Sequence, residues 1–385
     1  MAIATASGVV DTDALLADEK VVDMQKKHRL LDTDEAQFMT ILNKLPSQEA
    51  TREKVNWLED QYFPNYSTLA NSATSTTGSI DVATDTGAYF RAGDLVRVGL
   101  SGELLEVTGV TTDAVGVNRS IGGVIAATAQ SASDLIIVGN VSAQGADYGT
   151  LKVTTRVLGY NYTQIQRHPF GFTNTETVIE TYGIGDPANE VAKKAVEHKR
   201  ALENSCWVGG RDYDSATSKG WMGGIVAEFI STNVTSAVGT LSLTALDSAL
   251  EDIFQYGSMN KVIFAAPTPA GALSRLLANN WVMASPDSKV YGAKVNAFVN
   301  GAYGASVPVI VKREWGREQA ASGQRGGWMV VLDLAYIKKR PLRGTRLLRN
   351  RQAPGVDSQV HEYLTEMSLE VAQEKTHGIL KGITG

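Results

Sequence analysis

One segment constrains this 385-residue sequence more than any other: no lysine occurs between Lys54 and Lys152, and no proline between Pro64 and Pro169. From residue 72 to 150 it is rich in Thr, Ser, Gly, Val and Ala, and turn residues separate short apolar runs. Alternation with a period of two is typical of strands with one buried face. The pattern predicts a small antiparallel β module inserted between helical regions, with two longer strands returning from it. The expected strands of the module are 94–98, 103–107, 114–117 and 135–138, and the returning strands are 152–157 and 160–165.

The first 60 residues carry the charge imbalance of the chain. They hold 12 acids and 7 bases, which accounts for the whole formal net charge of −5. The part up to about Lys27 has few large apolar residues and predicts an arm ordered by contacts with neighbours. Capping acids at 32–35 and apolar residues at helical spacing predict a helix that stops near Pro46. With Ser47 as a cap, a second short helix is expected to about Tyr62.

The clearest helix signal lies at about 187–207. Asp186 is a good N-cap, Pro187 occupies the first helical position, and no breaker follows before Gly209. Roughly 20 residues at about 1.5 Å each span about 30 Å. A helix of this length with a narrow apolar stripe predicts a spine that lies across a sheet.

Residues 220–335 alternate runs of strand and helix character and predict a compact α/β subdomain. A closing pair of strands follows it, so the whole chain is expected to mix helices and sheets. The expected helices are 244–254 and 269–277, and the expected strands are 261–266, 307–311, 328–333, 364–371 and 377–381.

Composition argues against several classes of protein. With 36 Lys and Arg against 41 Asp and Glu, the chain lacks the basic excess of a protein that grips nucleic acid along its length. The single cysteine, Cys206, forbids an intrachain disulfide and fits folding in a reducing cytosol. No window of about 18 apolar residues predicts a transmembrane helix. The first residues lack the basic and apolar regions of a signal peptide.

No motif predicts catalysis, a cofactor or a metal ion. Residues 183–188 match the relaxed dinucleotide fingerprint G-x-G-x-x-A ahead of a helix. However, the Asp186 carboxylate would lie where a phosphate should bind, and no second strand with a ribose-binding acid follows. The five histidines are scattered singly, so no zinc site is expected.

One basic cluster stands out at residues 338–351, with seven bases and no acid. Lysine and arginine protect exposed edge strands, so the cluster fits a solvated edge strand or loop. It also fits contact with phosphate, or complementarity to the acidic first 60 residues of a neighbouring copy. With two segments of opposite charge in one chain, self-association explains the cluster at least as well as nucleic acid does.

The order of these parts resembles the major capsid proteins of tailed double-stranded-DNA phages, which have the Hong Kong 97-like fold. The resemblance covers roughly residues 50–385 and follows the order of motifs in one family of phage major head proteins. The motifs that carry it are Lys54–Asp60, Phe90–Val98, Glu103–Val107, Asn118–Gly123, Asn161–Ile165, Thr181–Ile184, Glu362–Val371 and His377-Gly378.

The resemblance implies an α+β subunit of five parts. In chain order they are an N-terminal arm with short helices (1–62), an extended loop (63–165) with a β-rich tip (about 86–146), a peripheral domain (166–219) with the spine helix (about 187–207), an axial α/β domain (220–345), and C-terminal strands returning to the peripheral domain (346–385).

The resemblance also implies what the subunit does. It is expected to form the hexamers and pentamers of an icosahedral phage head, part of the virion, assembled in the host bacterial cytoplasm. The subunit would contact double-stranded DNA only weakly. The further partners considered are portal, scaffolding and decoration proteins. No contact with a membrane is expected. Subunit contacts are expected at Arg91, Asp94, Arg97, Arg119, Arg343 and Arg346.

The sequence differs in two ways from the type member of the Hong Kong 97-like fold. Its shell is cross-linked through a lysine on the extended loop, and residues 55–151 contain none, so a non-covalent shell is expected. The N-terminal arm is short, so a separate scaffolding protein is expected.

Three alternatives remain open at this point. A cellular encapsulin-like compartment shares the fold, although the large β tip counts against it. A tail-tube or adhesion protein could use the Ser/Thr/Gly-rich strands but fits poorly with the long helix. A nucleotide-binding enzyme would be built on residues 176–335.

Overall fold

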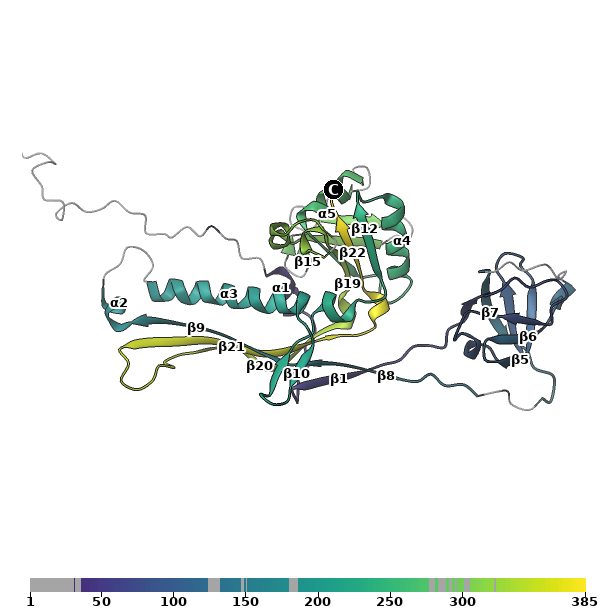
Figure 1. Ribbon diagram of the computed structural model, residues 1–385, viewed down its shortest axis with the longest axis horizontal. Helices are drawn as coiled ribbons and strands as arrows, with labels where there is room; N and C mark the ends of the chain where they lie inside the picture. The colour runs from purple at the N-terminus through teal and green to yellow at the C-terminus, as the bar shows by residue number, and fades with distance from the viewer. Residues whose placement is uncertain are drawn as a thin grey trace, which may run out of the picture. The chain divides into compact units, whose positions relative to one another are not determined.

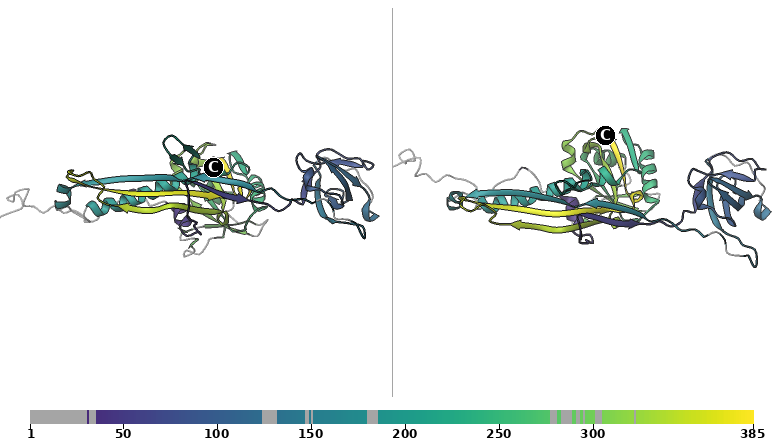
Figure 2. Two further views of the ribbon diagram at one scale, coloured as in Figure 1. Left: turned by 90° about the horizontal axis from the view of Figure 1, so that it is seen from below. Right: turned by 60° about the horizontal axis from the view of Figure 1, so that its bottom comes forward.

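The computed structural model describes residue 31 and residues 36–123, 132–146, 149, 151–179, 186–276, 281–282, 289–290, 293–294, 296–300, 305–321 and 323–385 (Figures 1 and 2). The chain divides into two compact units. The smaller unit is Leu58–Leu158, and the larger unit comprises Met1–Trp57 and Gly159–Gly385.

The smaller unit is built on one six-stranded antiparallel sheet in the order β2-β7-β4-β5-β6-β3. Alternate side chains point to a shared apolar core, as Val96 and Val98 on β4 and Leu105 and Val107 on β5 illustrate. The β module predicted from alternating hydrophobicity is therefore present. Its strands are β2 Tyr66–Thr68, β3 Ser79–Asp81, β4 Asp94–Val98, β5 Leu104–Thr111, β6 Ala114–Asn118 and β7 Asp134–Asn140.

The predicted helix from Ser47 to about Tyr62 is wrong, because strand β1 (Lys54–Glu59) occupies this segment and pairs with β8 (Val157–Tyr162). Val55 and Trp57 are buried while the residues between them are exposed, which is the period of a strand. A Cβ on Gly159 of β8 would lie 2.3 Å from the Trp57 indole nitrogen, so the bare glycine backbone makes room for the ring. The expected strand at 152–157 is also absent, since residues 151–156 have no regular structure.

In the larger unit, helix α3 (Asp186–Val208) lies along a three-stranded antiparallel sheet in the order β20-β21-β9 (Figure 1). The predicted spine helix is confirmed almost to the residue. Its sheet consists of β9 (Gln164–Thr173), β20 (Ile337–Leu348) and β21 (Ser358–Val371). Strand β21 is central and extends six residues further toward the N-terminus than predicted, because β9 pairs with it from Ser358 onward.

The second layer of the larger unit is a seven-stranded mixed sheet in the order β12-β22-β19-β13-β18-β17-β14. Alternate residues of its central strands point into two different hydrophobic cores. On β13, Val262 and Phe264 face one core. Ile263 and Ala265 face the other core, which helices α4 and α5 cover. The predicted α/β subdomain is thus present. Its elements are β12 Val234–Gly239, α4 Leu243–Phe254, β13 Lys261–Ala265, α5 Pro267–Leu276, β14 Trp281–Val282, β17 Asn296–Asn300, β18 Ala305–Val311, β19 Met329–Asp333 and β22 Gly378–Ile383.

Short elements complete the larger unit. Helix α1 (Gln37–Leu42) buries four of its six residues in the core that also holds Trp207 and Phe264, and the Phe38 and Trp207 rings lie 4.8 Å apart. The acids expected to cap this helix, 32–35, lie outside the described residues. The remaining elements are α2 Asn174–Val178, β10 Asp212–Asp214, β11 Lys219–Trp221, the π-helix Ile225–Phe229, β15 Lys289–Val290 and β16 Ala293–Lys294.

Candidate intersubunit surfaces

The basic cluster at 338–351 lies mainly on β20, an edge strand of the spine sheet, and β21 beside it carries the opposite charge. Glu370 accepts from Arg340 at 2.5 Å and contacts Lys338 at 3.4 Å. Arg343 donates to Glu366 at 2.6 Å. Three of the seven bases of the cluster are therefore paired with two acids within the chain, and a continuous track of unpaired positive charge for a phosphate backbone does not exist along β20.

The uncompensated part of the cluster lies toward the β20–β21 hairpin end. Arg346, Arg349 and Arg351 are exposed. Of the sequence-predicted contact residues, Arg346 therefore presents its charge to solvent, whereas Arg343 is committed to Glu366 although its side chain is 43% exposed.

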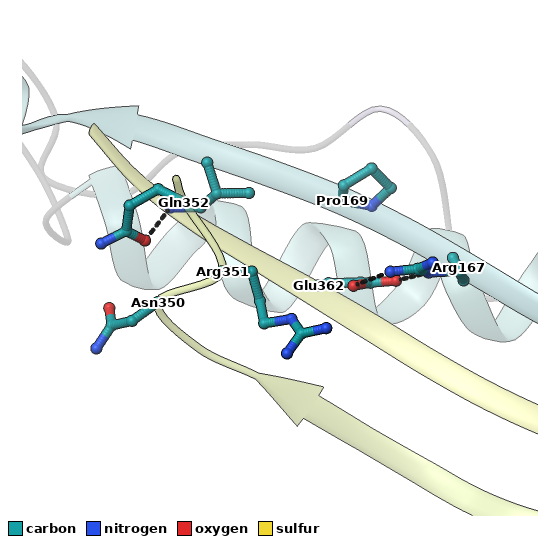
Figure 3. Close-up of a pocket in the computed structure, with 7 residues that line it drawn as sticks. Arg167, Pro169, Asn350, Arg351, Gln352 and Glu362 are labelled. Atoms are coloured by element: carbon teal, nitrogen blue, oxygen red, sulfur yellow. Dashed lines mark hydrogen bonds and ion pairs between the residues drawn. The ribbon is translucent and has the colours of Figure 1, made fainter. Parts of the chain in front are cut away.

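A pocket of about 450 Å³ opens at this hairpin end, lined by Arg167, Pro169, Asn350, Arg351, Gln352, Val360 and Glu362. In Figure 3, Arg351 lies between the amides of Asn350 and Gln352 on one side and the Arg167–Glu362 pair on the other. Arg167 binds the buried Glu362 carboxylate through two nitrogens, and this contact lowers the pKa of Glu362. The lining carries two guanidinium groups against one carboxylate, so the pocket suits an anionic side chain and offers no nucleophile–base pair for catalysis.

Two of the predicted contact residues in the β module are buried within it. Arg119 donates to Glu103 at 2.9 and 2.6 Å, and the Arg119 side chain is only 9% exposed. Asp94 is buried, accepts from the Arg91 backbone and Asn140 amide, and pairs with Arg91 at 3.5 Å. These charges hold the module together, and of the four residues only Arg91 and Arg97 are exposed.

Arg97 lies on the outer face of the β module in a row that crosses four strands. It is opposite Ile136 on β7 and Leu104 on β5, and Ile136 is opposite Tyr66 on β2. Tyr66 is 49% and Ile136 37% exposed. Arginine and tyrosine are among the residues enriched at the energetic centre of protein interfaces.

The other candidate sites from the sequence do not form a site in the part of the chain that the structure describes. No group of three or more His, Cys, Asp or Glu could hold a metal ion among these residues. Cys206 is buried, and burial raises the pKa of its thiol. The glycines of the dinucleotide-like turn, 183 and 185, lie outside the described residues. No described helix has the length and apolar character needed to cross a membrane.

Sequence reasoning missed two features. The acids that neutralise β20, Glu366 and Glu370, are spaced four apart, which places them on one face of a strand, so the signal was present. The contact between His168 on β9 and His198 on α3, at 2.8 Å, joins residues 30 apart and carried no local signal.

The parts now described, a spine helix along a long three-stranded sheet, a two-faced α/β layer and a separate β module, define the Hong Kong 97-like class of phage capsid subunits. The solved capsids of Cyanophage A-1(L) and Myoviridae Phage XM1 share this fold. The A-1(L) capsid matches with a TM-score of 0.51 and 13% identity over 97% of this chain and 99% of that chain. The XM1 capsid matches with a TM-score of 0.50 and 8% identity over 98% and 100%.

The SU10 major capsid protein family model matches residues 7–384, so the chain belongs to that family. The SrpI encapsulin of Synechococcus elongatus PCC 7942 is also similar, with a TM-score of 0.44 and 10% identity over 60% of this chain and 78% of that chain. A search of curated proteins finds no match. Family membership indicates a structural role in the capsid shell of a virion.

Proposed function

We propose that this chain assembles with copies of itself into the hexamers and pentamers of an icosahedral phage head that encloses double-stranded DNA. The observation that carries the proposal is the family match over residues 7–384. Assembly would take place in the host bacterial cytoplasm. The function needs no catalytic residue, cofactor or metal ion.

The five-part division is part of the proposal. The N-terminal arm is 1–62 and the extended loop 63–165, with its β-rich tip at about 86–146. The peripheral domain is 166–219, with its spine at about 187–207. The axial domain is 220–345, and the returning strands are 346–385. Two strands cross these bounds: β20 (Ile337–Leu348) lies in the spine sheet, and β22 (Gly378–Ile383) joins the seven-stranded sheet, so it does not pair with β21 as the sequence predicted. The independent smaller unit Leu58–Leu158 supports the idea that the extended loop carries a module able to reach another subunit.

Charge supports the proposed contacts between copies. Residues 58–158 hold 10 acids and 5 bases and residues 1–57 hold 10 acids and 7 bases, while residues 159–385 hold 21 acids and 24 bases. Opposite net charge on two parts of one chain favours contact between different copies. Arg91 and Arg97 on the β module and Arg346 near the hairpin end are the predicted contact residues that we assign to neighbours. Asp94, Arg119 and Arg343 would act indirectly, by holding these surfaces in shape.

Further partners follow from the same function. A portal, a separate scaffolding protein and decoration proteins are proposed, and contact with packaged DNA would be weak and non-specific. Cohesion would come from non-covalent contacts of the arm and the β module.

Electron microscopy of the chain expressed alone and with its neighbouring genes tests the proposal. Closed shells, rings of five or six, or sheets are expected, and particles from an infected host should contain double-stranded DNA. Shells that enclose a protein cargo instead would favour an encapsulin-like compartment. A uniform monomer or dimer under every condition would overturn the proposal, and nucleotide binding at 183–188 would then be tested.

A further inference from the structure

The contact between α3 and the spine sheet contains a chain of hydrogen bonds that crosses all four elements. Nδ1 of His168 on β9 lies 2.8 Å from Nδ1 of His198 on α3. Nε2 of His198 lies 2.7 Å from the Thr365 hydroxyl on β21, which donates to the Thr345 hydroxyl on β20 at 2.9 Å. Tyr363 stacks on the His198 ring with centroids 5.9 Å apart.

The hydrogen positions in this chain follow from the donors available. Because the Thr365 hydroxyl donates to Thr345, it accepts from His198, so Nε2 of His198 carries a hydrogen. In a neutral ring Nδ1 of His198 is then bare, and the hydrogen between the two rings belongs to His168. All donors therefore point the same way, from β9 through α3 to β21 and β20.

This arrangement accepts one extra proton but not two. His168 is half-buried and can bind a proton on its own Nε2 while Nδ1 still donates, which strengthens the bond to His198. Once His168 is protonated, a proton on Nδ1 of His198 would point a second N–H at the first across 2.8 Å. That species loses the bond and places two positive rings together in a buried site, because His198 is 1% exposed.

Among the residues that the structure describes, none with a negative charge contacts either histidine ring on this face. On α3, Lys194, one turn before His198, is paired with Glu197 at 2.6 Å. On β21, Tyr363 stacks on the His198 ring, whereas His361 contacts Phe170 and Phe172 instead. Glu362 alternates to the other side of the strand, where it binds Arg167 of β9. On β20, Arg346 follows Thr345 and is exposed. Burial, followed by the proximity of His168, lowers the pKa of His198 to about 4.

We propose that the His168–His198 pair is a one-proton clasp: it fastens α3 to the spine sheet while it holds no more than one extra proton, and it opens when a second proton binds, on His198. Acidification would then free the helix to move against its sheet without unfolding the rest of the larger unit. The proposal concerns the subunit itself and stands or falls independently of the assembly contacts proposed above.

The difference in the pKa of His198 between the open and closed states sets how strongly helix opening depends on pH. In the open state His198 would titrate near its ordinary pKa of about 6.5, and in the closed state it titrates at about 4. The open form therefore binds more protons between these values. The opening constant should rise about tenfold per pH unit, or about 300-fold in all, as the pH falls from 6.5 to 4.

The test uses the full chain and two mass-spectrometric readouts. Exchange of the ring C2 hydrogens gives the titration of each histidine in the unmutated protein, and we expect His198 to titrate near 4. Amide exchange over 195–202, corrected for the intrinsic pH dependence, gives the opening constant. We expect its rise to vanish in His198→Gln and to persist in the control His361→Gln, which leaves the clasp intact.

Three results would overturn the clasp. One is titration of His198 near 6.5 in the unmutated protein, a measurement that needs no variant to fold. Another is a rise in helix opening that His198→Gln leaves unchanged. The third is loss of protection over the whole larger unit at the same pH as over 195–202, because the proposal requires the helix to open first.

Discussion

Glu203 lies near the end of α3 with an exposure of 1%, and its carboxylate joins two distant parts of the chain. One oxygen accepts the backbone N–H of Met39 in α1 at 3.1 Å, and the other binds the buried ammonium of Lys312 after β18. A buried charge is tolerated only while its partners remain, because desolvation costs several kcal/mol per ion. The residue therefore ties the N-terminal helix, the spine and the α/β layer together.

Lys312→Met tests this role. The substitution leaves the Glu203 carboxylate buried without its cation, and we expect the free energy of unfolding to fall by about 3–5 kcal/mol. Denaturant unfolding of the dissociated subunit measures the change. The double variant Lys312→Met with Glu203→Gln removes both charges and should recover most of the loss. Equal losses in the single and double variants would contradict the account.

His377 provides a pH prediction at the same scale. Its Nδ1 accepts the Asp333 backbone N–H at 3.1 Å, so the folded state requires that nitrogen to be unprotonated. Burial is the largest cause that lowers the pKa of His377 to about 4 from 6.5. The unfolded chain binds more protons between these values, so this contribution to stability is complete above pH 6.5 and is lost as the pH falls to about 4.

The expected slope from His377 is about 1.4 kcal/mol of unfolding free energy per pH unit within that window. His198 adds a second contribution of the same sign. Unfolding midpoints of wild type and His377→Gln from pH 7 to 4 measure it, and the variant should show a clearly shallower dependence. A variant as pH-sensitive as wild type would show that this histidine is not buried in its neutral form.

At the scale of elements, the end of α3 depends on a close approach of two backbones. Gly209 follows the helix, and a Cβ there would lie 2.2 Å from the Met222 carbonyl oxygen. Gly209→Ala should cost about 1–3 kcal/mol of stability, the range for overpacking. Gly210→Ala is the matched control, because nothing lies within 4 Å of its Cβ, and it should change stability by less than about 0.5 kcal/mol. Thermal unfolding of both variants distinguishes the effect of the close contact on stability from the effect of replacing a glycine.

The elements that were predicted correctly have strong local patterns. The spine helix has a proline start, an unbroken run of helix formers and a glycine end, and the β module alternates through every strand. The segment at Lys54–Glu59 was mistaken for a helix because Val55, Trp57 and Leu58 fit both periods over so short a run. Only pairing with β8, about 100 residues away, decides that it is a strand.

The candidate surfaces were predicted less well than the fold, because they too depend on pairing between segments that are distant in the sequence. The basic cluster was recognised by composition, but composition cannot tell that Glu366 and Glu370 lie opposite Arg343 and Lys338. Arg119 likewise gave no sign that its partner is Glu103, 16 residues earlier and buried. Which charges remain for a neighbour depends on strand register, and register is a tertiary property.

At the scale of the whole molecule, the proposed contacts between copies predict different effects for substitutions at Arg346 and Arg343. Arg346→Glu reverses an exposed charge near the hairpin end and should reduce the yield of assembled shells by about tenfold with little change in the stability of the subunit. Arg343→Glu would face Glu366 within the chain and should lower subunit stability as well. Sedimentation of assembly reactions, combined with unfolding of the dissociated subunits, distinguishes them. Normal assembly of the Arg346 variant would remove this residue from the proposed interface.

Cohesion of the assembled shell gives the last prediction. The extended loop has no lysine from 55 to 151, and Lys152, the first to follow, donates to the Ala88 carbonyl at 2.7 Å and lies over the Phe63 ring. Burial lowers the pKa of Lys152, but these contacts hold its amine within its own module and away from a neighbour. Mature particles boiled in detergent should therefore yield a single band near 41.2 kDa, and strong denaturant should dissociate them completely. A ladder of joined subunits that disappears in Lys152→Arg would show instead that this lysine leaves these contacts and forms a cross-link.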